Sequence, residues 1–306
     1  MSLVPAQFSQ LNRLIDLQLV AFPEHRAYLV KRFSDSDTAH LEFCEQLSGN
    51  VLRIAGGDIA QVLEDYHWLS DEILKEELFF RREGRYRLSK LSDAIEQVYA
   101  NAPYMGKYIH GILASQVWWR NHAEVMRYFR DAFLPGNKQG FAHLEVGPGH
   151  GLFLALAAGA PHCASAQGWD ISDTSLNGTR AALAAMGAPG NITLRSVNIV
   201  EAPDGRFDSI TFSEVLEHLE EPLQTLKALY GLLSPGGRIF VNAPVNSPAP
   251  DHLYLFRTPE EVRDMVAEAG FEIVETLYAP PTGASLEKAR KQELSISAAI
   301  IARRPG

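Results

Sequence analysis

The sequence predicts an α/β protein: a mostly helical N-terminal half followed by a seven-stranded, doubly wound and largely parallel β-sheet with helices on both faces. Two observations lead to this fold. From residue 141 onward, apolar runs of strand length alternate with helical patterns, as in chains that wind back and forth across a parallel sheet. Before about residue 135, apolar residues instead recur every three or four positions, which is the spacing of amphipathic helices.

The N-terminal half, residues 1–137, is expected to form a domain of its own. The stretch beginning "GDIAQVLEDYHWLSDEILKEE" predicts two short helices, over 58–66 and 70–81. A turn at Glu83 and Gly84 then separates two short alternating segments, a pattern typical of a winged helix. Acidic residues match or outnumber basic ones here, so we expect this region to serve dimer contact or lid support rather than DNA binding.

A longer aromatic-rich helix is predicted over residues 104–133, and the stretch "LPGNKQG" ends it with a Pro-Gly turn. The catalytic domain is expected to follow over residues 138–306. Its predicted strands share strand length and turn-forming ends, and they cover residues 141–146, 166–170, 192–197, 207–212, 238–243, 271–278 and 295–302. Because no strong hydrophobic helix joins the last two, we expect them to pair antiparallel at one edge.

Composition excludes several classes of function. The chain has 306 residues, of which 46% are hydrophobic, and a net charge of −9. An acidic chain without a Lys/Arg block is not expected to bind nucleic acid or an anionic membrane. Cys44 and Cys163 are too few for a disulfide framework or a four-ligand metal site, and no stretch reads as a signal peptide or membrane span. We therefore expect a cytoplasmic protein.

The stretch "HLEVGPGHG" after the first predicted strand indicates a ligand site. It places Gly147, Gly149 and Gly151 at alternate positions, with Glu145 two residues before the first. Such a turn lets the backbone approach a ligand, although the glycines could also serve close packing alone. Asp170, at the end of the next predicted strand, can bind both hydroxyls of a ribose. No Walker lysine follows, and Glu145 would repel a pyrophosphate, so a different ribose-containing ligand is indicated.

Four segments in order, "HLEVGPGHG", "GWDIS", "FDSITFSEVLEHLEEP" and "LLSPGGRIFVNAP", resemble the class I S-adenosylmethionine-dependent methyltransferases over residues 141–302. The resemblance implies S-adenosylmethionine as the cofactor and a sheet of order 3-2-1-4-5-7-6 with strand 7 antiparallel. It implies that Glu145 orders the turn and the cofactor's amino-acid end. It also implies that the three glycines border the methionyl and ribose portions and that Asp170 binds the ribose hydroxyls.

The same resemblance assigns the rest of the cofactor site. Ile171, Asn198 and Ile199 should lie beside the adenine, with Asn198 at a position where the family often has aspartate. An asparagine can still donate and accept hydrogen bonds at an amino-purine edge. Ser213 and Glu214, which end the fourth predicted strand, should border the methyl-donor sulfur.

The acceptor is expected outside the carboxyl ends of the strands, under a polar loop and the aromatic helix. In the loop, Asn246, His252 and Arg257 suit a small zwitterion, and His252 is a candidate base or hydrogen-bond donor, with a plain surface histidine as the alternative. The aromatic helix offers lid residues over the pocket, although packing between the two halves would also explain them. These lid candidates are Tyr108, His110, Trp119 and His122.

His218, in "EVLEHLEEP", is a second candidate base. Plant-type O-methyltransferases, which also carry a winged-helix dimerisation half, place a catalytic histidine in a Leu-His-Asp-Trp motif here. In this chain the histidine falls one position later and the tryptophan is absent. A shift of one residue turns a helical side chain by about 100°, so the assignment of His218 as a base stays open.

These features predict methyl transfer to a small molecule. The whole-chain pattern, including "NAPVNSPAPDH", resembles the bacterial methionine S-methyltransferases of the dimethylsulfoniopropionate pathway. This resemblance implies the thioether of methionine as the acceptor and S-methylmethionine as the product. The alternatives are an O- or N-methyltransferase with a histidine base and a cofactor-sensing, DNA-binding regulator. We expect a homodimer through the N-terminal domain and, without an Asp-Asp-Asn constellation, no metal.

Overall fold

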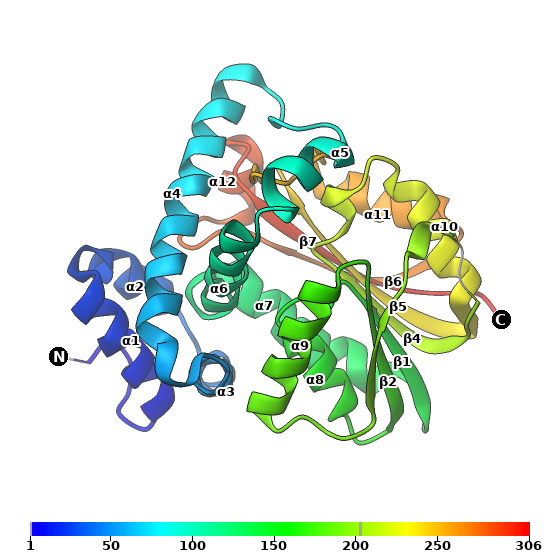
Figure 1. The fold of residues 1–306 in the computed structure, drawn as a ribbon, viewed down its shortest axis with the longest axis horizontal. Helices are drawn as coiled ribbons and strands as arrows, with labels where there is room; N and C mark the ends of the chain where they lie inside the picture. Colours follow the sequence, from blue (N-terminus) through cyan, green and yellow to red (C-terminus); the bar gives the residue numbers. More distant parts are fainter. Residues whose placement is uncertain (1, 202–203) are drawn as a thin grey trace.

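A seven-stranded sheet forms the C-terminal half of the protein, in the order β3-β2-β1-β4-β5-β7-β6 (Figure 1). The computed structural model describes residues 2–201 and 204–306. The strands are β1 (Phe141–Val146), β2 (Cys163–Asp170), β3 (Ile192–Ser196), β4 (Phe207–Ser213), β5 (Leu233–Val245), β6 (Glu272–Ala279) and β7 (Ile296–Arg303). Strand β7 runs antiparallel to both neighbours, and the other pairs are parallel. The predicted fold class and strand order are confirmed.

Helices cover both faces of the sheet because side chains alternate between the faces along each strand. On β5, Phe240 joins a core shared with the N-terminal helices, whereas its neighbours Ile239 and Val241 pack in a second core under α10 and α11. The helices of this half are α8 (Leu152–Ala158), α9 (Asp173–Met186), α10 (Pro222–Leu232), α11 (Pro259–Glu268) and α12 (Leu286–Lys291), with short 3-10 turns at Ile199–Glu201 (η6) and Leu216–His218 (η7).

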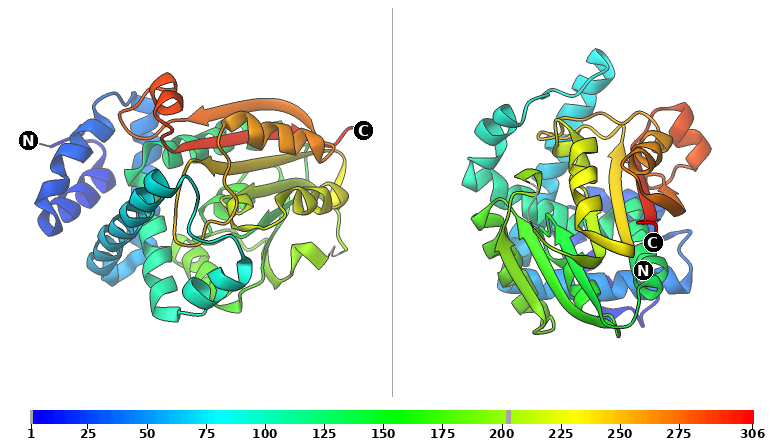
Figure 2. Two further views of the ribbon diagram at one scale, coloured as in Figure 1. Left: turned by 90° about the horizontal axis from the view of Figure 1, so that it is seen from above. Right: turned by 90° about the vertical axis from the view of Figure 1, so that its right-hand side faces the viewer.

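The N-terminal half is helical, as predicted, and its first helices lie at the end of the molecule opposite the C-terminus (Figures 1 and 2). Its helices are α1 (Ser9–Ala21), α2 (Arg26–Phe33), α3 (Thr38–Ala55), α4 (Ile59–Glu83), α5 (Leu91–Ala94), α6 (Ala102–Trp118) and α7 (Arg120–Tyr128). Short 3-10 segments join them at Pro23–His25, Gly56–Asp58 and Leu134–Gly136, and π-helical turns lie at Ile95–Tyr99 and Phe129–Phe133. Among the described residues, no helix is both long and apolar enough to cross a bilayer.

The predicted winged helix is wrong. A single helix, α4, replaces the two short ones, because nothing between Tyr66 and Ser70 breaks it and both Tyr66 and Leu69 are buried. The helix ends where the turn was predicted, at Gly84, whose φ of 68° gives a left-handed cap. No strand lies between residues 84 and 90, so the wing is missing from this described stretch.

The predicted helix over residues 104–133 is also interrupted. Trp119 adopts an extended conformation, with φ −91° and ψ 123°, which ends α6 and lets α7 begin at Arg120. Tertiary hydrogen bonds hold this break: the Trp119 indole donates to the Tyr66 hydroxyl at 3.0 Å, and the Arg120 amide donates to Thr282 Oγ1 at 3.2 Å. Local spacing carries no signal for such distant partners.

Buried histidines make the fold sensitive to acid. His143, fully buried in β1, lies 3.0 Å from Ser209 Oγ and 3.3 Å from Thr211 Oγ1, and burial lowers its pKa from 6.5 to about 3. Below pH 6.5 the unfolded chain takes up a proton that the folded chain excludes. The free energy of unfolding therefore decreases as the pH is lowered. From pH 7.5 to 5.5 we expect His143 alone to remove about 1.4 kcal/mol from the free energy of unfolding.

Urea unfolding of the wild type and of His143→Gln at both pH values measures this effect. The substitution removes one titrating group, so the variant should lose less stability between the two pH values, whatever its stability at pH 7.5. An equal loss in both proteins would contradict the assignment.

Candidate active site

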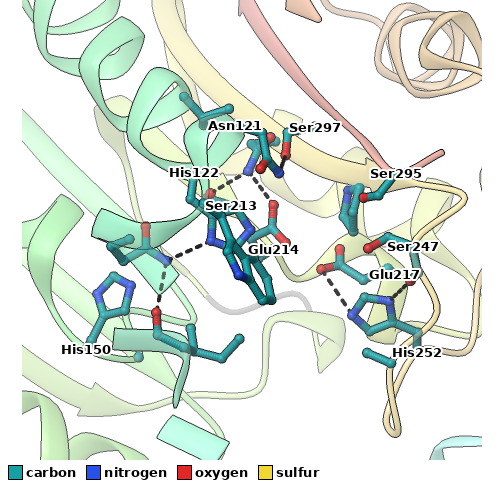
Figure 3. Close-up of a pocket in the computed structure, with 18 of the residues that line it drawn as sticks. Asn121, His122, His150, Ser213, Glu214, Glu217, Ser247, His252, Ser295 and Ser297 are labelled. Atoms are coloured by element: carbon teal, nitrogen blue, oxygen red, sulfur yellow. Dashed lines mark hydrogen bonds and ion pairs between the residues drawn. The ribbon is translucent and has the colours of Figure 1, made fainter. Parts of the chain in front are cut away.

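A cavity of about 450 Å³ lies at the carboxyl ends of β1, β4 and β5, beneath α6 and α7 (Figure 3). Parallel strands bring their carboxyl ends to one edge of a sheet, which is where ligands bind in folds of this type. The strand ends contribute polar groups to the lining, and α6 and α7 contribute aromatic and amide groups from the other side. No lysine or arginine is found among the described lining residues.

The glycine turn after β1 forms one wall of the cavity. Gly147, Gly149 and Gly151 have φ of 71°, 47° and 73°, in the left-handed region that side chains disfavour. A Cβ on Gly147 would lie 2.8 Å from Cγ2 of Val215. Gly147 and Gly149 line the cavity, while Gly151 caps the start of α8 outside the lining. The backbone is thus open to a ligand at this wall.

Beside this turn lies the buried carboxylate of Glu145. It lines the cavity, and its Oε2 has no hydrogen-bond partner among the described residues. Burial raises the pKa of this carboxyl well above its usual value. A ligand beside the glycine turn could donate a hydrogen bond to Oε2 from a cationic or N–H group. That hydrogen bond would offset the free-energy cost of burying the carboxylate.

Asp170 lies at the end of β2, at the margin of the cavity. Its carboxylate accepts hydrogen bonds from the Ser172 amide at 2.9 Å and from Ser175 Oγ at 2.8 Å. Ser175 lines the cavity, whereas Asp170 itself does not.

The three residues expected beside the adenine also lie outside the lining. Ile171 is exposed, Ile199 is buried within η6, and Asn198 bonds within its own turn, to Val200 N and Glu201 Oε1. Ile171 and Asn198 thus lie on the exposed surface at this end of the sheet.

The end of β4 brings Ser213 and Glu214 into the cavity as a pair. The side-chain amide of Asn242, on the neighbouring strand β5, donates to Ser213 Oγ at 3.1 Å and to Glu214 Oε1 at 2.6 Å. Glu214 has a φ of 55°, which is rare for a residue with a side chain and marks stored strain. Burial also raises the pKa of its carboxyl.

A second group gathers Glu217, His218 and His252 in the cavity lining. Figure 3 shows Glu217 and His252 on the side of the cavity away from His150. Glu217 is completely buried, and neither carboxylate oxygen has a hydrogen-bond partner among the described residues. Its Oε1 lies 3.6 Å from His218 Nε2 and 3.9 Å from His252 Nε2. The Glu217 carbonyl accepts from the Leu253 and Tyr254 amides, which ties the polar loop to η7.

Of the predicted lid residues, Tyr108, Trp119 and His122 line the cavity. His110 lies outside the lining, with its Nδ1 2.7 Å from Asp65 Oδ2. The Tyr108 hydroxyl donates to Asp251 Oδ1 at 2.9 Å. The His122 ring packs against Trp119 at 4.8 Å, and its Nδ1 accepts from the Gln116 amide at 3.2 Å. Burial lowers the pKa of His122 to about 3, so this imidazole stays neutral at physiological pH.

Two predicted substrate residues lie outside the cavity lining. Asn246 has a φ of 47°, and its side chain donates to the Arg257 carbonyl at 3.0 Å. The Arg257 guanidinium is directed to the Gly84 carbonyl, 3.0 Å away. Both side chains thus shape the loop and its contact with the end of α4.

Sequence reasoning missed several polar lining residues. Asn121 donates to Ser297 Oγ at 2.9 Å across 176 positions of the chain, a pairing that no local pattern could indicate. Glu217 and Asn242 did carry a signal. Glu217 follows the predicted strand over 207–212, and Asn242 lies at the carboxyl end of the predicted strand over 238–243, where cavity-facing polar residues are common.

Comparison with known proteins identifies the family. A family model described as a methyltransferase domain matches residues 118–276, just over half of this 306-residue chain. The chain belongs to the class I S-adenosylmethionine-dependent methyltransferases. The glycine turn and the carboxyl edge of the sheet are therefore the cofactor region of a methyltransferase fold, and S-adenosylmethionine is its cofactor.

The methyltransferase is 31% identical over 152 residues to a ubiquinone biosynthesis O-methyltransferase from Thiobacillus denitrificans, covering 43% of this chain and 65% of that protein. It is 32% identical over 108 residues to a ubiquinone/menaquinone biosynthesis C-methyltransferase from an Enterobacter species, covering 33% of this chain and 43% of that one. The matches thus span less than two thirds of these relatives.

Two solved structures share the fold of the methyltransferase across both of its halves. An O-methyltransferase family protein from Burkholderia thailandensis has a TM-score of 0.54 at 16% identity, covering 82% of this chain and 73% of that one. The pyocyanin biosynthetic protein PhzM has a TM-score of 0.54 at 16% identity, covering 84% and 76%. These identities support the fold and carry no information about the acceptor.

The glycine turn yields a stability prediction. Gly147→Ala adds left-handed strain and a 2.8 Å contact with Val215, so we expect it to lower the free energy of unfolding by about 2 kcal/mol or more. Gly149→Ala is the matched control, because nothing lies within 4 Å of its added Cβ, and we expect about 1 kcal/mol from strain alone. Urea denaturation measures both values. Equal losses would mean that the contact with Val215 relaxes at no cost.

Proposed function

We propose that this methyltransferase transfers the methyl group of S-adenosylmethionine to a small molecule enclosed between the strand ends and helices α6 and α7. The observation that carries the proposal is the Glu145 carboxylate, buried beside the glycine turn with one oxygen that has no hydrogen-bond partner among the described residues. An ammonium group is the natural partner for such an oxygen, and the cofactor has one at its amino-acid end.

The residues at this edge fit the cofactor. When bound, S-adenosylmethionine supplies an electrophilic methyl group on a sulfonium. Glu145 would accept from its ammonium, and the glycines would border its methionyl and ribose portions. Asp170, held by Ser172 and Ser175, would bind the ribose hydroxyls at the margin of the cavity. The proposed adenine contacts are Ile171, Asn198 and Ile199, and Ser213 and Glu214 would border the methyl donor.

Glu145→Gln tests the cofactor site, because it keeps the shape of the side chain and removes its charge. We expect the dissociation constant for S-adenosylhomocysteine, measured by calorimetry, to rise at least about tenfold. Binding of 5′-methylthioadenosine, which lacks the amino-acid end, should not change. If the two ligands weaken equally, Glu145 supports the fold of the turn rather than the ammonium.

For the acceptor, we propose the thioether of methionine. The carboxylate of Glu214, which lines the cavity, suits the ammonium of an amino acid, and the aromatic rings of Tyr108 and Trp119 suit a sulfonium product. A thioether attacks with a lone pair that is already free, so no base is required. The chain then has to orient the acceptor and keep water out, which is the task of an enclosed cavity.

A second candidate is O- or N-methyl transfer with His252 as the base. Its Nδ1 lies 2.6 Å from the Ser247 carbonyl, which accepts the Nδ1 proton and leaves the Nε2 lone pair free. The named activity of the Thiobacillus relative, O-methylation in ubiquinone biosynthesis, also favours this candidate. His218 would then be a neighbour of the base, since its ring lies 4.9 Å from that of His252.

A screen of acceptors separates the two candidates. We expect release of S-adenosylhomocysteine with methionine and none with phenols or amines. With methionine, His252→Ala should raise KM and leave kcat nearly unchanged, because the reaction needs no proton acceptor. Turnover of a phenol or amine in place of methionine, with kcat falling in His252→Ala, would replace the thioether proposal with the base-dependent one. The homodimer expected from the sequence stays a prediction.

A further inference from the structure

Two imidazoles and a buried carboxylate converge in the lining of the cavity. The three side chains are those of Glu217, His218 and His252, and one ligand-type atom of each lies within 4.8 Å of the others. Glu217 comes from the 3-10 turn after β4 together with His218, and His252 comes from the polar loop after β5. The 3-10 turn therefore positions Glu217 and His218, and the packing of the polar loop against it adds His252.

The hydrogen bonds behind the two imidazoles determine which nitrogen carries the proton. His252 Nδ1 lies 2.6 Å from the Ser247 carbonyl, and His218 Nδ1 lies 3.1 Å from the Asp251 carbonyl. A carbonyl oxygen can only accept, so each Nδ1 is the protonated nitrogen. Each Nε2 therefore presents a lone pair, and both face Oε1 of Glu217, at 3.6 and 3.9 Å.

Glu217 adds an unpartnered carboxylate to these two lone pairs. The residue is completely buried, and neither of its oxygens has a hydrogen-bond partner among the described residues. An isolated buried carboxylate that faces two further lone pairs is strongly unfavourable. A cation placed between the three atoms removes this penalty.

We propose that Glu217, His218 and His252 bind a divalent first-row transition metal ion of the zinc class. Two imidazole nitrogens and one carboxylate oxygen are a typical donor set for such ions. Zinc-ligand bonds of 2.0–2.1 Å at tetrahedral angles put ligand atoms about 3.4 Å apart. The two distances from Glu217, 3.6 and 3.9 Å, lie close to this spacing.

The groups behind the ligands match the outer shell of known metal sites. Ligating histidines usually donate their second nitrogen to a carbonyl or carboxylate, which orients the ring. His218 Nδ1 has both kinds of partner, since Oδ2 of the buried Asp251 lies 3.4 Å away in addition to the carbonyl. Asp251 is itself held by the hydroxyls of Tyr99, at 3.2 Å, and Tyr108, at 2.9 Å. We assign Asp251 a positioning role.

The metal ion would give the cavity a fixed positive charge, which the lysine and arginine side chains do not provide there. No lysine or arginine is found among the described lining residues, so the carboxylate or hydroxyl of an acceptor meets no fixed cation there. Three protein ligands leave a fourth position open, as in catalytic zinc sites, and all three ligands line the cavity. An acceptor with a carboxylate or hydroxyl oxygen would bind at that position. This inference departs from the sequence-based expectation of no metal.

Metal binding by the full chain, stripped with a chelator and then titrated, tests the proposal without cofactor or acceptor. We expect one equivalent of Zn²⁺ by calorimetry, and Co²⁺ should develop the visible absorption of a low-coordinate nitrogen- and oxygen-ligated site. Glu217→Gln and His252→Ala should each weaken binding by more than about tenfold, and Asp251→Asn by about tenfold. His150→Ala is the matched control, because His150 also lines the cavity but lies outside the group.

The outcomes that overturn the proposal are distinct. If the stripped wild-type chain takes up no Zn²⁺, Glu217 is instead protonated and hydrogen-bonded to a histidine. If His150→Ala weakens binding as much as His252→Ala, the uptake is unspecific. Circular dichroism checks that each variant folds, and Asp251→Asn stands in for any ligand variant that does not. Binding of S-adenosylhomocysteine, measured in parallel, reports on the methyl-transfer proposal separately, so either proposal can fail alone.

Discussion

The packing of helix α7 against the sheet is the interaction on which the site depends. Phe129, which follows α7, stacks against Phe133 at 5.3 Å and contacts Phe153 and Phe240 at 5.0 and 5.2 Å. These rings come from the helical half, from α8 and from β5, so one core holds the two halves together. It places α6 and α7 over the strand ends, and without them the cavity would be an open edge of the sheet.

Closure of that edge explains the chemistry of the cavity. Away from water, a carboxylate without a partner is costly, and in the described part of the chain Glu145 and Glu217 both have oxygens without a hydrogen-bond partner. Such a cavity attracts positive charge. The sulfonium cofactor, an ammonium on the acceptor and a metal ion would each supply that charge. The two carboxylates come from different elements, Glu145 from β1 and Glu217 from η7 after β4. One can therefore serve the cofactor while the other serves the acceptor side.

The sheet and the glycine turn were predictable because their signals are local. The first strand was predicted with the bounds that the structure has, Phe141–Val146, and the turn after it keeps its three glycines in left-handed conformations. The helical half was less predictable. The break at Trp119 depends on Tyr66 and Thr282, which lie far away in the sequence. The continuity of α4 depends on the burial of Tyr66 and Leu69, at the position where the sequence predicts a boundary between two helices.

The sequence by itself determined the order of strands and helices, the glycine turn and the family, since alternating apolar runs and turn residues act over a few positions. Only the tertiary structure decided which polar side chains share the cavity. Asn121 donates a hydrogen bond to Ser297, and His252 lies beside Glu217, because a loop and two helices pack on the strand ends. Asn246 and Arg257 belong to the same polar loop, yet their side chains bond to backbone carbonyls outside the cavity. The physical reason is that docking depends on the shape of the whole core, whereas periodicity reports only on neighbours along the chain.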